Sequence, residues 1–285
     1  MELSKDRIDI LKKVEEYERL GLFDRDVEND PPTRPLHAGE VDYIGNKAST
    51  RFFTKIANII GQNHFEKALK RGDFVIEDIR GIENFRAVAD KGVLITCNHF
   101  SVYDNYAVYK TLEPELDGKM LYKIIREGNY TSFKGLYGFL FRHCNTLPLS
   151  SSLSCMKELM SATDTLFKRG EKILIYPEQA MWYNYKKPRP LKKGAFRIAA
   201  RSKVDILPIF ITHTDTDRIG SDGYYAQSYT VHILPPIFYD AEKSVSENTD
   251  LACKKNYELW KECYEGFYKT KLEYTTEGGA DPCST

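Results

Sequence analysis

The 285-residue sequence predicts an α/β fold with a mixed sheet flanked by helices and a helical N-terminal piece. Short apolar runs rich in β-branched residues alternate with amphipathic stretches along most of the chain, which is typical of α/β domains. The clearest runs are 93–97 and 172–176, and a polar motif stands at the end of each. Because sites in open α/β sheets form at such strand ends, we expect the functional residues there.

The first 72 residues are expected to form helices joined by a proline-rich arm. Residues 4–20 place apolar side chains at helical spacing, and Gly21 ends this pattern. The acidic, proline-rich segment that follows, to about Gly45, predicts a long ordered arm or linker. Residues 48–70 form a second helical pattern that is basic and apolar. Packing on the core is the commoner fate of such a helix, and docking on a membrane surface is the alternative.

Residues 73–240 contain the predicted α/β core, and residues 241–285 a C-terminal helix and tail. Strands are expected at 74–79, 93–97, 120–125, 146–149, 172–176, 204–212 and 228–234. Helices are expected between most of them, including one rich in glycine and aromatic residues at 133–141. The last helix is predicted from 246 to about 273, and the small polar residues after Thr275 are expected to fray.

Charge, cysteine usage and hydropathy exclude several classes of protein. The 41 basic and 41 acidic residues balance, so no general attraction to nucleic acid is expected. The six cysteines show no CxxC and no paired spacing, which predicts reduced thiols in a cytoplasmic protein. No stretch approaches the ~20 apolar residues of a membrane span. We therefore expect a cytoplasmic protein, and if its substrate is a lipid, it must meet that lipid peripherally at the inner face of the membrane.

The central motif follows the first of the two clear apolar runs. Asn98 and His99 stand where that strand ends, and Ser101 is placed to cap a helix whose first turns hold Asp104. A carboxylate that accepts the proton of one imidazole nitrogen fixes the tautomer and raises the basicity of the other. This predicts that His99 deprotonates a hydroxyl or amine, with Asp104 orienting it.

Two other features of the sequence compete with this motif. His37 and Asp42 have the same spacing, but they lie near prolines with no strand before them, so we expect no function for this pair. Cys97 stands two residues before His99 and is a possible rival nucleophile. A buried structural thiol is the favoured interpretation of Cys97.

Three further blocks accompany the Asn-His-x4-Asp motif. They are Gly138–Arg142, the pair Pro177 and Glu178, and Leu207–Ile209. Four blocks in this order, over about residues 75–240, resemble the glycerolipid acyltransferase family of the lysophosphatidic acid acyltransferase type. The resemblance implies that residues 73–240 form an acyltransferase core.

The resemblance also implies a reaction. His99 would take a proton from a lysophospholipid or related lipid acceptor, which then attacks the thioester of acyl-CoA or acyl carrier protein, while Asp104 holds the imidazole. No metal ion and no other cofactor is implied. The expected substrate-binding residues are Asn98, Ser101, Arg142, Pro177, Glu178 and Lys193. The expected partners are the lipid acceptor, the acyl donor and an anionic membrane surface.

The sequence departs from the family pattern after Glu178. The family continues Gly-Thr-Arg, whereas here the residues are Gln179–Met181, so an arginine that could hold a phosphate bidentately is missing. Met181 and Trp182 are predicted to offer an apolar surface for an acyl chain or sugar face. We therefore expect lysophosphatidic acid not to be the best acceptor. The rival is that basic residues within 186–193 bind the phosphate.

Two other functions stay open alongside acyl transfer. With water in place of the acceptor, the same residues would make a thioesterase or lysolipid hydrolase, although no Gly-x-Ser-x-Gly motif is present. A non-catalytic lipid- or carrier-binding module is the other alternative, and the presence of both His99 and Asp104 counts against it.

Overall fold

The computed structural model describes residues 4–220, 223–277 and 281–284. Among them, seven strands form a sheet in the order β1-β8-β7-β2-β5-β3-β4. These strands are β1 Phe74–Arg80, β2 Val93–Thr96, β3 Leu121–Arg126, β4 Thr146–Leu149, β5 Lys172–Ile175, β7 Ile206–Ile219 and β8 Tyr225–Ile233. β7, β2, β5, β3 and β4 run parallel to one another, and β8 and β1 run the opposite way. The predicted mixed sheet is confirmed.

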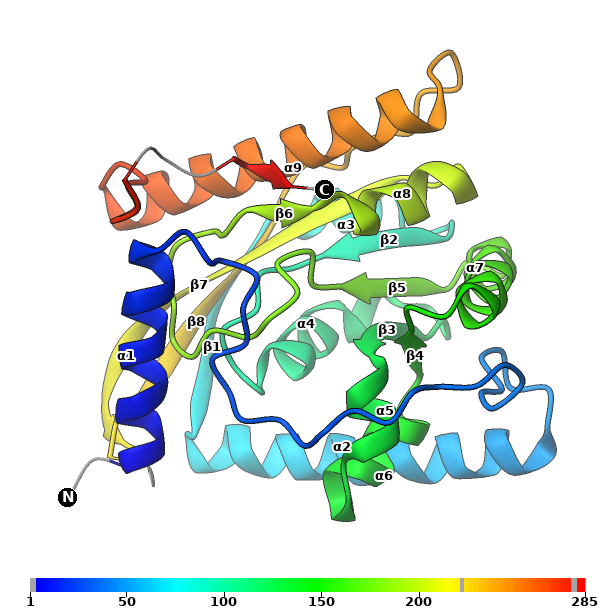
Figure 1. Cartoon of the computed structure of the whole chain (residues 1–285), viewed down its shortest axis with the longest axis horizontal. Helices are drawn as coiled ribbons and strands as arrows, with labels where there is room; N and C mark the ends of the chain where they lie inside the picture. The colour runs from blue at the N-terminus through cyan, green and yellow to red at the C-terminus, as the bar shows by residue number, and fades with distance from the viewer. Residues whose placement is uncertain (1–3, 221–222, 278–280, 285) are drawn as a thin grey trace.

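Helices cover the sheet on both faces (Figure 1). They are α1 Lys5–Arg19, α2 Ala48–Arg71, α3 Ile82–Arg86, α4 Asp104–Leu112, α5 Glu127–Ser132, α6 Gly135–His143, α7 Leu153–Lys168, α8 Lys193–Ser202 and α9 Val245–Tyr268, with a 3₁₀ turn at Glu113–Glu115. The helical N-terminal piece and the C-terminal helix are confirmed. The short helix α5 was not predicted from the sequence.

The sheet separates two hydrophobic cores, and the side chains of the buried strand β2 alternate between them. Leu94 packs with α7, α8 and α9 on one face of the sheet, whereas Val93 and Ile95 pack with α4 on the other, as the alternation of strand side chains requires. Gly92 precedes β2 where α7 ends, and a Cβ at this position would overlap the backbone of Phe167. This close approach requires glycine at position 92.

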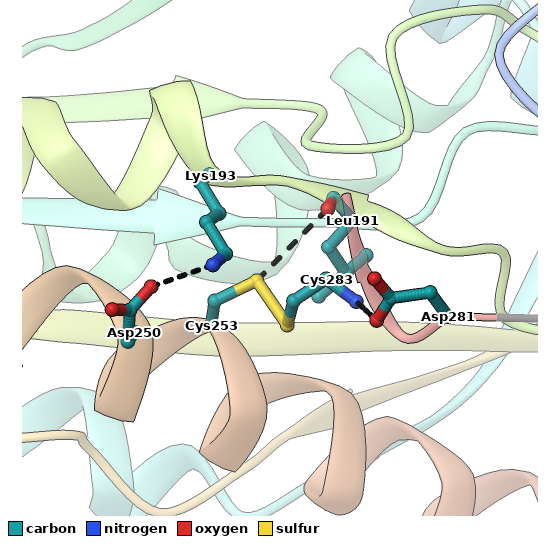
Figure 2. The surroundings of a disulfide bond; sticks show 6 residues. All are labelled: Leu191, Lys193, Asp250, Cys253, Asp281 and Cys283. Atoms are coloured by element: carbon teal, nitrogen blue, oxygen red, sulfur yellow. Dashed lines mark hydrogen bonds and ion pairs between the residues drawn. A yellow bond between two sulfur atoms is a disulfide. The ribbon is translucent and has the colours of Figure 1, made fainter. Parts of the chain in front are cut away.

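The C-terminal tail is held to the core, so the prediction of a frayed tail is wrong for residues 281–284. Cys283–Ser284 form the short strand β9, which pairs with β6 at Leu191–Lys192. Cys283 also forms a disulfide with Cys253 of α9 (Figure 2). The prediction of reduced thiols is therefore wrong for these two cysteines, and cysteine usage no longer supports a cytoplasmic location.

The N-terminal segment packs over the loop that follows β5. Val14 of α1 and Phe23 join a small apolar cluster with Ala180 and Trp182. Farther along, the proline-rich arm runs past α5, where the Leu36 N–H donates to the Glu127 carboxylate at 3.1 Å. The arm is therefore an ordered segment, as predicted.

Helix α2 buries its small residues and exposes its large apolar ones. Ala57, Gly61 and Ala68 are buried, and Gly61 lies against α6. Phe52 and Phe53 are 60% and 42% exposed. Packing in the protein core therefore does not explain the presence of Phe52 and Phe53 on this helix. None of the helices in the described part of the chain is long and apolar enough to cross a bilayer.

Candidate active site

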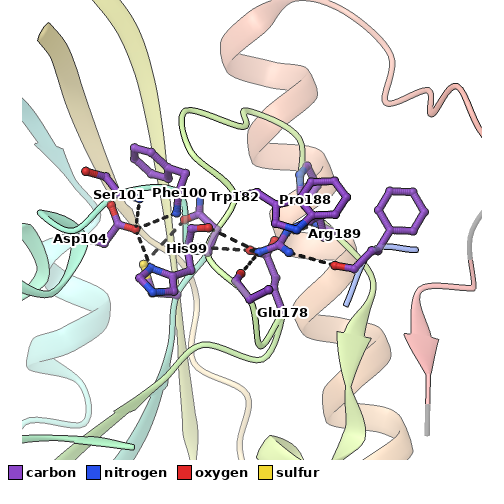
Figure 3. Close-up of polar contacts among 12 residues, drawn as sticks. His99, Phe100, Ser101, Asp104, Glu178, Trp182, Pro188 and Arg189 are labelled. Atoms are coloured by element: carbon purple, nitrogen blue, oxygen red, sulfur yellow. Dashed lines mark hydrogen bonds and ion pairs between the residues drawn. The ribbon is translucent and has the colours of Figure 1, made fainter. Parts of the chain in front are cut away.

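His99 and Asp104 meet at the carboxyl end of β2, where the chain turns into α4 (Figure 3). The Nδ1 atom of His99 lies 3.0 Å from Oδ2 of Asp104. The imidazole is 18% exposed, whereas the carboxyl group is fully buried. An ionised carboxylate only accepts hydrogen bonds, so it places the proton on Nδ1 and leaves Nε2 as the basic nitrogen. The predicted pair is thus brought together in the geometry of a general base and its orienting partner.

The Asp104 carboxyl group is also held by the backbone. Its Oδ2 accepts the N–H groups of Phe100 and Ser101 at 2.8 and 2.9 Å, besides the contact with His99. Burial raises the pKa of Asp104, while the hydrogen bonds from His99 and the two N–H groups act in the opposite direction. Because three donors converge on one oxygen, neither the carboxyl group nor the loop before α4 is free to rotate.

The neighbours Asn98 and Ser101 make contacts within the protein. The buried Asn98 amide pairs with β7, donating to the Ile211 carbonyl at 3.0 Å and accepting its N–H at 2.8 Å. Ser101 does not cap α4, because the residue at the cap position is Tyr103 and it makes no side-chain cap bond. Instead the Ser101 hydroxyl accepts the Tyr103 N–H at 3.2 Å. The expected contacts of Asn98 and Ser101 with substrate stay predictions.

Pro177 and Glu178 brace the loop that faces His99. The buried Glu178 carboxylate accepts the His99 N–H at 3.0 Å and the Arg189 N–H at 2.8 Å, and it pairs with the Arg189 guanidinium at 3.0 Å. The Pro177 carbonyl accepts the Lys192 N–H at 2.8 Å. Both residues therefore lie beside the motif, and their contact with substrate stays a prediction.

The departure from the family pattern has a structural counterpart. Gln179, which stands where the family has glycine, adopts a left-handed backbone with φ of 68°, the conformation that glycine adopts most easily. Trp182 is fully buried against Phe23 and donates from its indole to the Arg25 carbonyl at 2.9 Å. The prediction that Trp182 offers an open surface for substrate is therefore wrong.

Four of the five basic residues within 186–193 pair with acidic residues elsewhere in the chain, and the fifth, Lys186, lies over the Tyr268 ring. The pairs are Lys187–Glu18 at 2.6 Å, Arg189–Glu178 at 3.0 Å, Lys192–Asp24 at 3.2 Å and Lys193–Asp250 at 2.7 Å. The Lys193 pair joins the start of α8 to α9 (Figure 2). These acidic partners offset the positive charge that would otherwise attract a phosphate. The role of Lys193 in substrate binding stays a prediction.

Arg142 lies at the end of α6 and lines a cavity of about 390 Å³. Its guanidinium donates to the Phe133 and Tyr130 carbonyls at 3.1 and 3.4 Å. The other lining residues come from the arm and from α2, β3, α5, α6 and β4, and include Lys47, Arg51, Phe53, Tyr122 and His143. His99 and Asp104 are not in this lining. The expected contact of Arg142 with the acceptor head group stays a prediction.

Tyr176 contributes to the site although the sequence did not mark it as functional. Its ring stacks on the His99 imidazole, with centroids 4.0 Å apart and planes at 16°. The only sequence signal for this residue was its position at the end of a predicted strand.

The two competing features do not form sites. Cys97 is fully buried, and burial raises the pKa of its thiol, which opposes thiolate formation. The interpretation as a buried structural thiol is confirmed. The Asp42 carboxylate accepts the Asn46 and Lys47 N–H groups, and it caps the turn before α2 instead of orienting His37.

The chain is similar to known acyltransferases in part of its sequence and in its fold. Residues 77–212 match the family model described as Acyltransferase. Among solved structures, the chain is similar to the 1-acyl-sn-glycerophosphate (LPA) acyltransferase PlsC from Thermotoga maritima, with a TM-score of 0.53 and 18% sequence identity. The alignment covers 81% of this chain and 92% of that one, and at this identity it shows a shared fold. The search of curated proteins gave no significant match.

Proposed function

Because residues 77–212 match the acyltransferase family model, we propose that the chain moves a fatty acyl group from acyl-CoA or acyl carrier protein to a lysophospholipid or related lipid acceptor. The observation that carries this proposal is the contact of 3.0 Å between His99 Nδ1 and Asp104 Oδ2. It leaves Nε2 as a base on a partly exposed imidazole at the end of the parallel strands.

In the proposed mechanism, Nε2 of His99 takes the proton of the acceptor hydroxyl or amine. The deprotonated atom attacks the thioester carbonyl carbon and forms a tetrahedral intermediate. The carbon–sulfur bond then breaks, the acyl group stays on the acceptor, and the thiolate leaves with the proton from His99. Asp104 stabilises the imidazolium that forms between these steps. No covalent acyl-enzyme is required.

We also propose that the protein meets its lipid acceptor at an anionic membrane surface. The exposed pair Phe52 and Phe53 supports this, together with the exposed basic residues Lys55 and Lys67 on the same helix. Phenyl groups that enter a bilayer boundary and lysines that attract anionic head groups are the two parts of an interfacial helix.

Substitution of His99 tests the proposed base directly. The variant H99A should fold like the parent and lose acyl transfer by ~10²–10⁴-fold, the range that general base catalysis contributes. The control H37A, which changes an exposed histidine of the arm, should keep full activity. Products from acyl-CoA and a lysolipid panel are measured by mass spectrometry. Transfer by H99A within a few-fold of the parent excludes this mechanism, and release of free fatty acid in place of acylated lipid indicates a hydrolase.

A further inference from the structure

Arg189 is a buried arginine that the proposed chemistry does not use. Its side chain is 1% exposed and pairs with the equally buried Glu178 at 3.0 Å. A buried ion pair persists only where further hydrogen bonds satisfy both groups. The remaining acceptors of the Arg189 guanidinium therefore indicate what it holds in place.

One of those acceptors is the backbone carbonyl of His99, and Figure 3 shows Arg189 and Glu178 beside that residue. Glu178 accepts the His99 N–H at 3.0 Å, while Nη2 of Arg189 donates to the His99 carbonyl at 3.4 Å. The Trp182 N–H donates to the same carbonyl at 3.1 Å. Both polar groups of the His99 backbone are thus tied to the loop after β5. The direction in which the imidazole leaves the chain depends on these contacts.

The same guanidinium reaches the N-terminal segment. Its Nη1 donates to the Phe23 carbonyl at 2.9 Å, and its plane lies over the Trp182 ring, 4.7 Å from the centroid. Nη2 also donates to the Ala180 carbonyl. A planar group with several fixed donors can serve these acceptors together, which the single ammonium group of lysine cannot do.

We propose that Arg189 is a positioning residue for acyl transfer, which acts with Glu178 to fix the backbone of His99 so that Nε2 faces the acceptor. This proposal rests on the proposed role of His99 as base. It also excludes Arg189 as the missing phosphate ligand, because its donors are turned to one carboxylate and to backbone carbonyls beneath α1.

The test compares kcat and KM of two variants of the full-length protein. R189K keeps the charge and loses the fork of donors, and its matched control R86K makes the same exchange in the exposed ion pair between Arg86 and Glu115. We expect R189K to melt within a few degrees of the parent and to lose kcat by about 10- to 100-fold, since small misplacements of a catalytic group have effects of this size. The KM values for donor and acceptor should change by less than about twofold, and R86K should match the parent.

A second variant covers the case in which R189K does not fold. The double substitution E178Q/R189M removes both buried charges, which avoids leaving one of them unpaired, and it should also lower kcat with little change in KM. A folded R189K with parental kcat, or a rise confined to KM, overturns the proposal. H99A is assayed in parallel. Activity in H99A shows instead that the assignment of the base is wrong, so the two failures are distinguishable.

Discussion

The imidazole of His99 lies flat against the phenol ring of Tyr176, with ring centroids 4.0 Å apart. The phenol oxygen of Tyr176 is buried and has no hydrogen-bond partner among the described residues. Burial raises the pKa of Tyr176 well above its usual value, so the phenol stays neutral. The ring, and not the hydroxyl, is therefore what Tyr176 contributes to the orientation of His99.

Substitutions at Tyr176 separate these two groups. Y176F keeps the stacked ring and removes an unsatisfied hydroxyl, so we expect activity within about twofold of the parent and stability higher by ~1 kcal/mol. Y176A removes the ring, whose stacking is worth roughly 0.5–1.5 kcal/mol, and kcat should fall by about tenfold. Steady-state kinetics and thermal melts of both variants measure this. Equal loss of activity in Y176F and Y176A would show that the hydroxyl matters instead.

Buried histidines should make the protein sensitive to mild acid. Burial lowers the pKa of His213 to about 4, and its Nδ1 pairs with Oε1 of Gln227 at 2.7 Å. Between pH 6.5 and 4 the unfolded chain binds a proton at this residue and the folded chain does not. The contribution of His213 to stability is thus complete above about pH 6.5 and is lost as the pH falls toward 4.

Denaturant unfolding at pH 7.5 and pH 4.5 measures this effect. The free energy of unfolding should fall between these values by ~3 kcal/mol more in the parent than in H213N, from the size of the pKa shift. The variant H37N changes an exposed histidine and should keep the parental dependence. Equal falls in the parent and H213N would show that His213 titrates normally.

The exposed face of α2 predicts reversible binding to anionic vesicles. Phe52 and Phe53 supply the apolar contact and the lysines of α2 the electrostatic part, so binding should weaken as salt screens the charges. The double variant F52S/F53S should reduce binding by at least about tenfold in vesicle sedimentation. Its matched control is L153S, which removes an 81% exposed leucine at the start of α7. If both variants bind like the parent, or the parent does not bind at low salt, α2 is not the docking surface.

The contact between His99 and Asp104 was predictable because its geometry is local. A buried strand, a short turn and a helix start fix where His99 and Asp104 lie, and each is readable from neighbouring residues. The contacts of His99 with Tyr176 and Arg189 join residues 77 and 90 positions apart. Hydrophobic periodicity does not encode such pairings, which depend on strand order and on where the N-terminal segment packs.

The C-terminal tail and the basic stretch 186–193 also depend on contacts between residues that are far apart in the sequence. Small polar residues after Thr275 predicted a frayed end, but the pairing of β9 with β6 and the Cys253–Cys283 disulfide hold it. The sequence left open whether basic residues within 186–193 bind a phosphate. Four of these residues have acidic partners, which come from the segments around α1, from the loop after β5 and from α9, and no local pattern reveals them. Composition identifies the charges but not their partners.

The ion pairs of the stretch 186–193 bear on the identity of the acceptor. They support the expectation, drawn from the sequence, that lysophosphatidic acid is not the best acceptor. A phosphate needs a cation with free donors, whereas Arg189 is committed to Glu178 and Lys193 to Asp250. We therefore expect a lysolipid with another head group, or an amino- or glycolipid, to be turned over faster than lysophosphatidic acid. Initial rates over a panel of acceptors, with one acyl donor, measure the order.

Lys193 provides the variant that decides between the two interpretations. If its ammonium group only joins α8 to α9, K193A should lower thermal stability slightly and leave the KM for lysophosphatidic acid within about twofold of the parent, because a half-exposed ion pair contributes little. D250N removes the partner and serves as the control, with the same small effect. If the ammonium group instead leaves Asp250 to bind the phosphate, K193A should raise the KM for lysophosphatidic acid without altering that for the acyl donor, and D250N should not. That pattern, together with lysophosphatidic acid as the fastest acceptor, would contradict the expected preference.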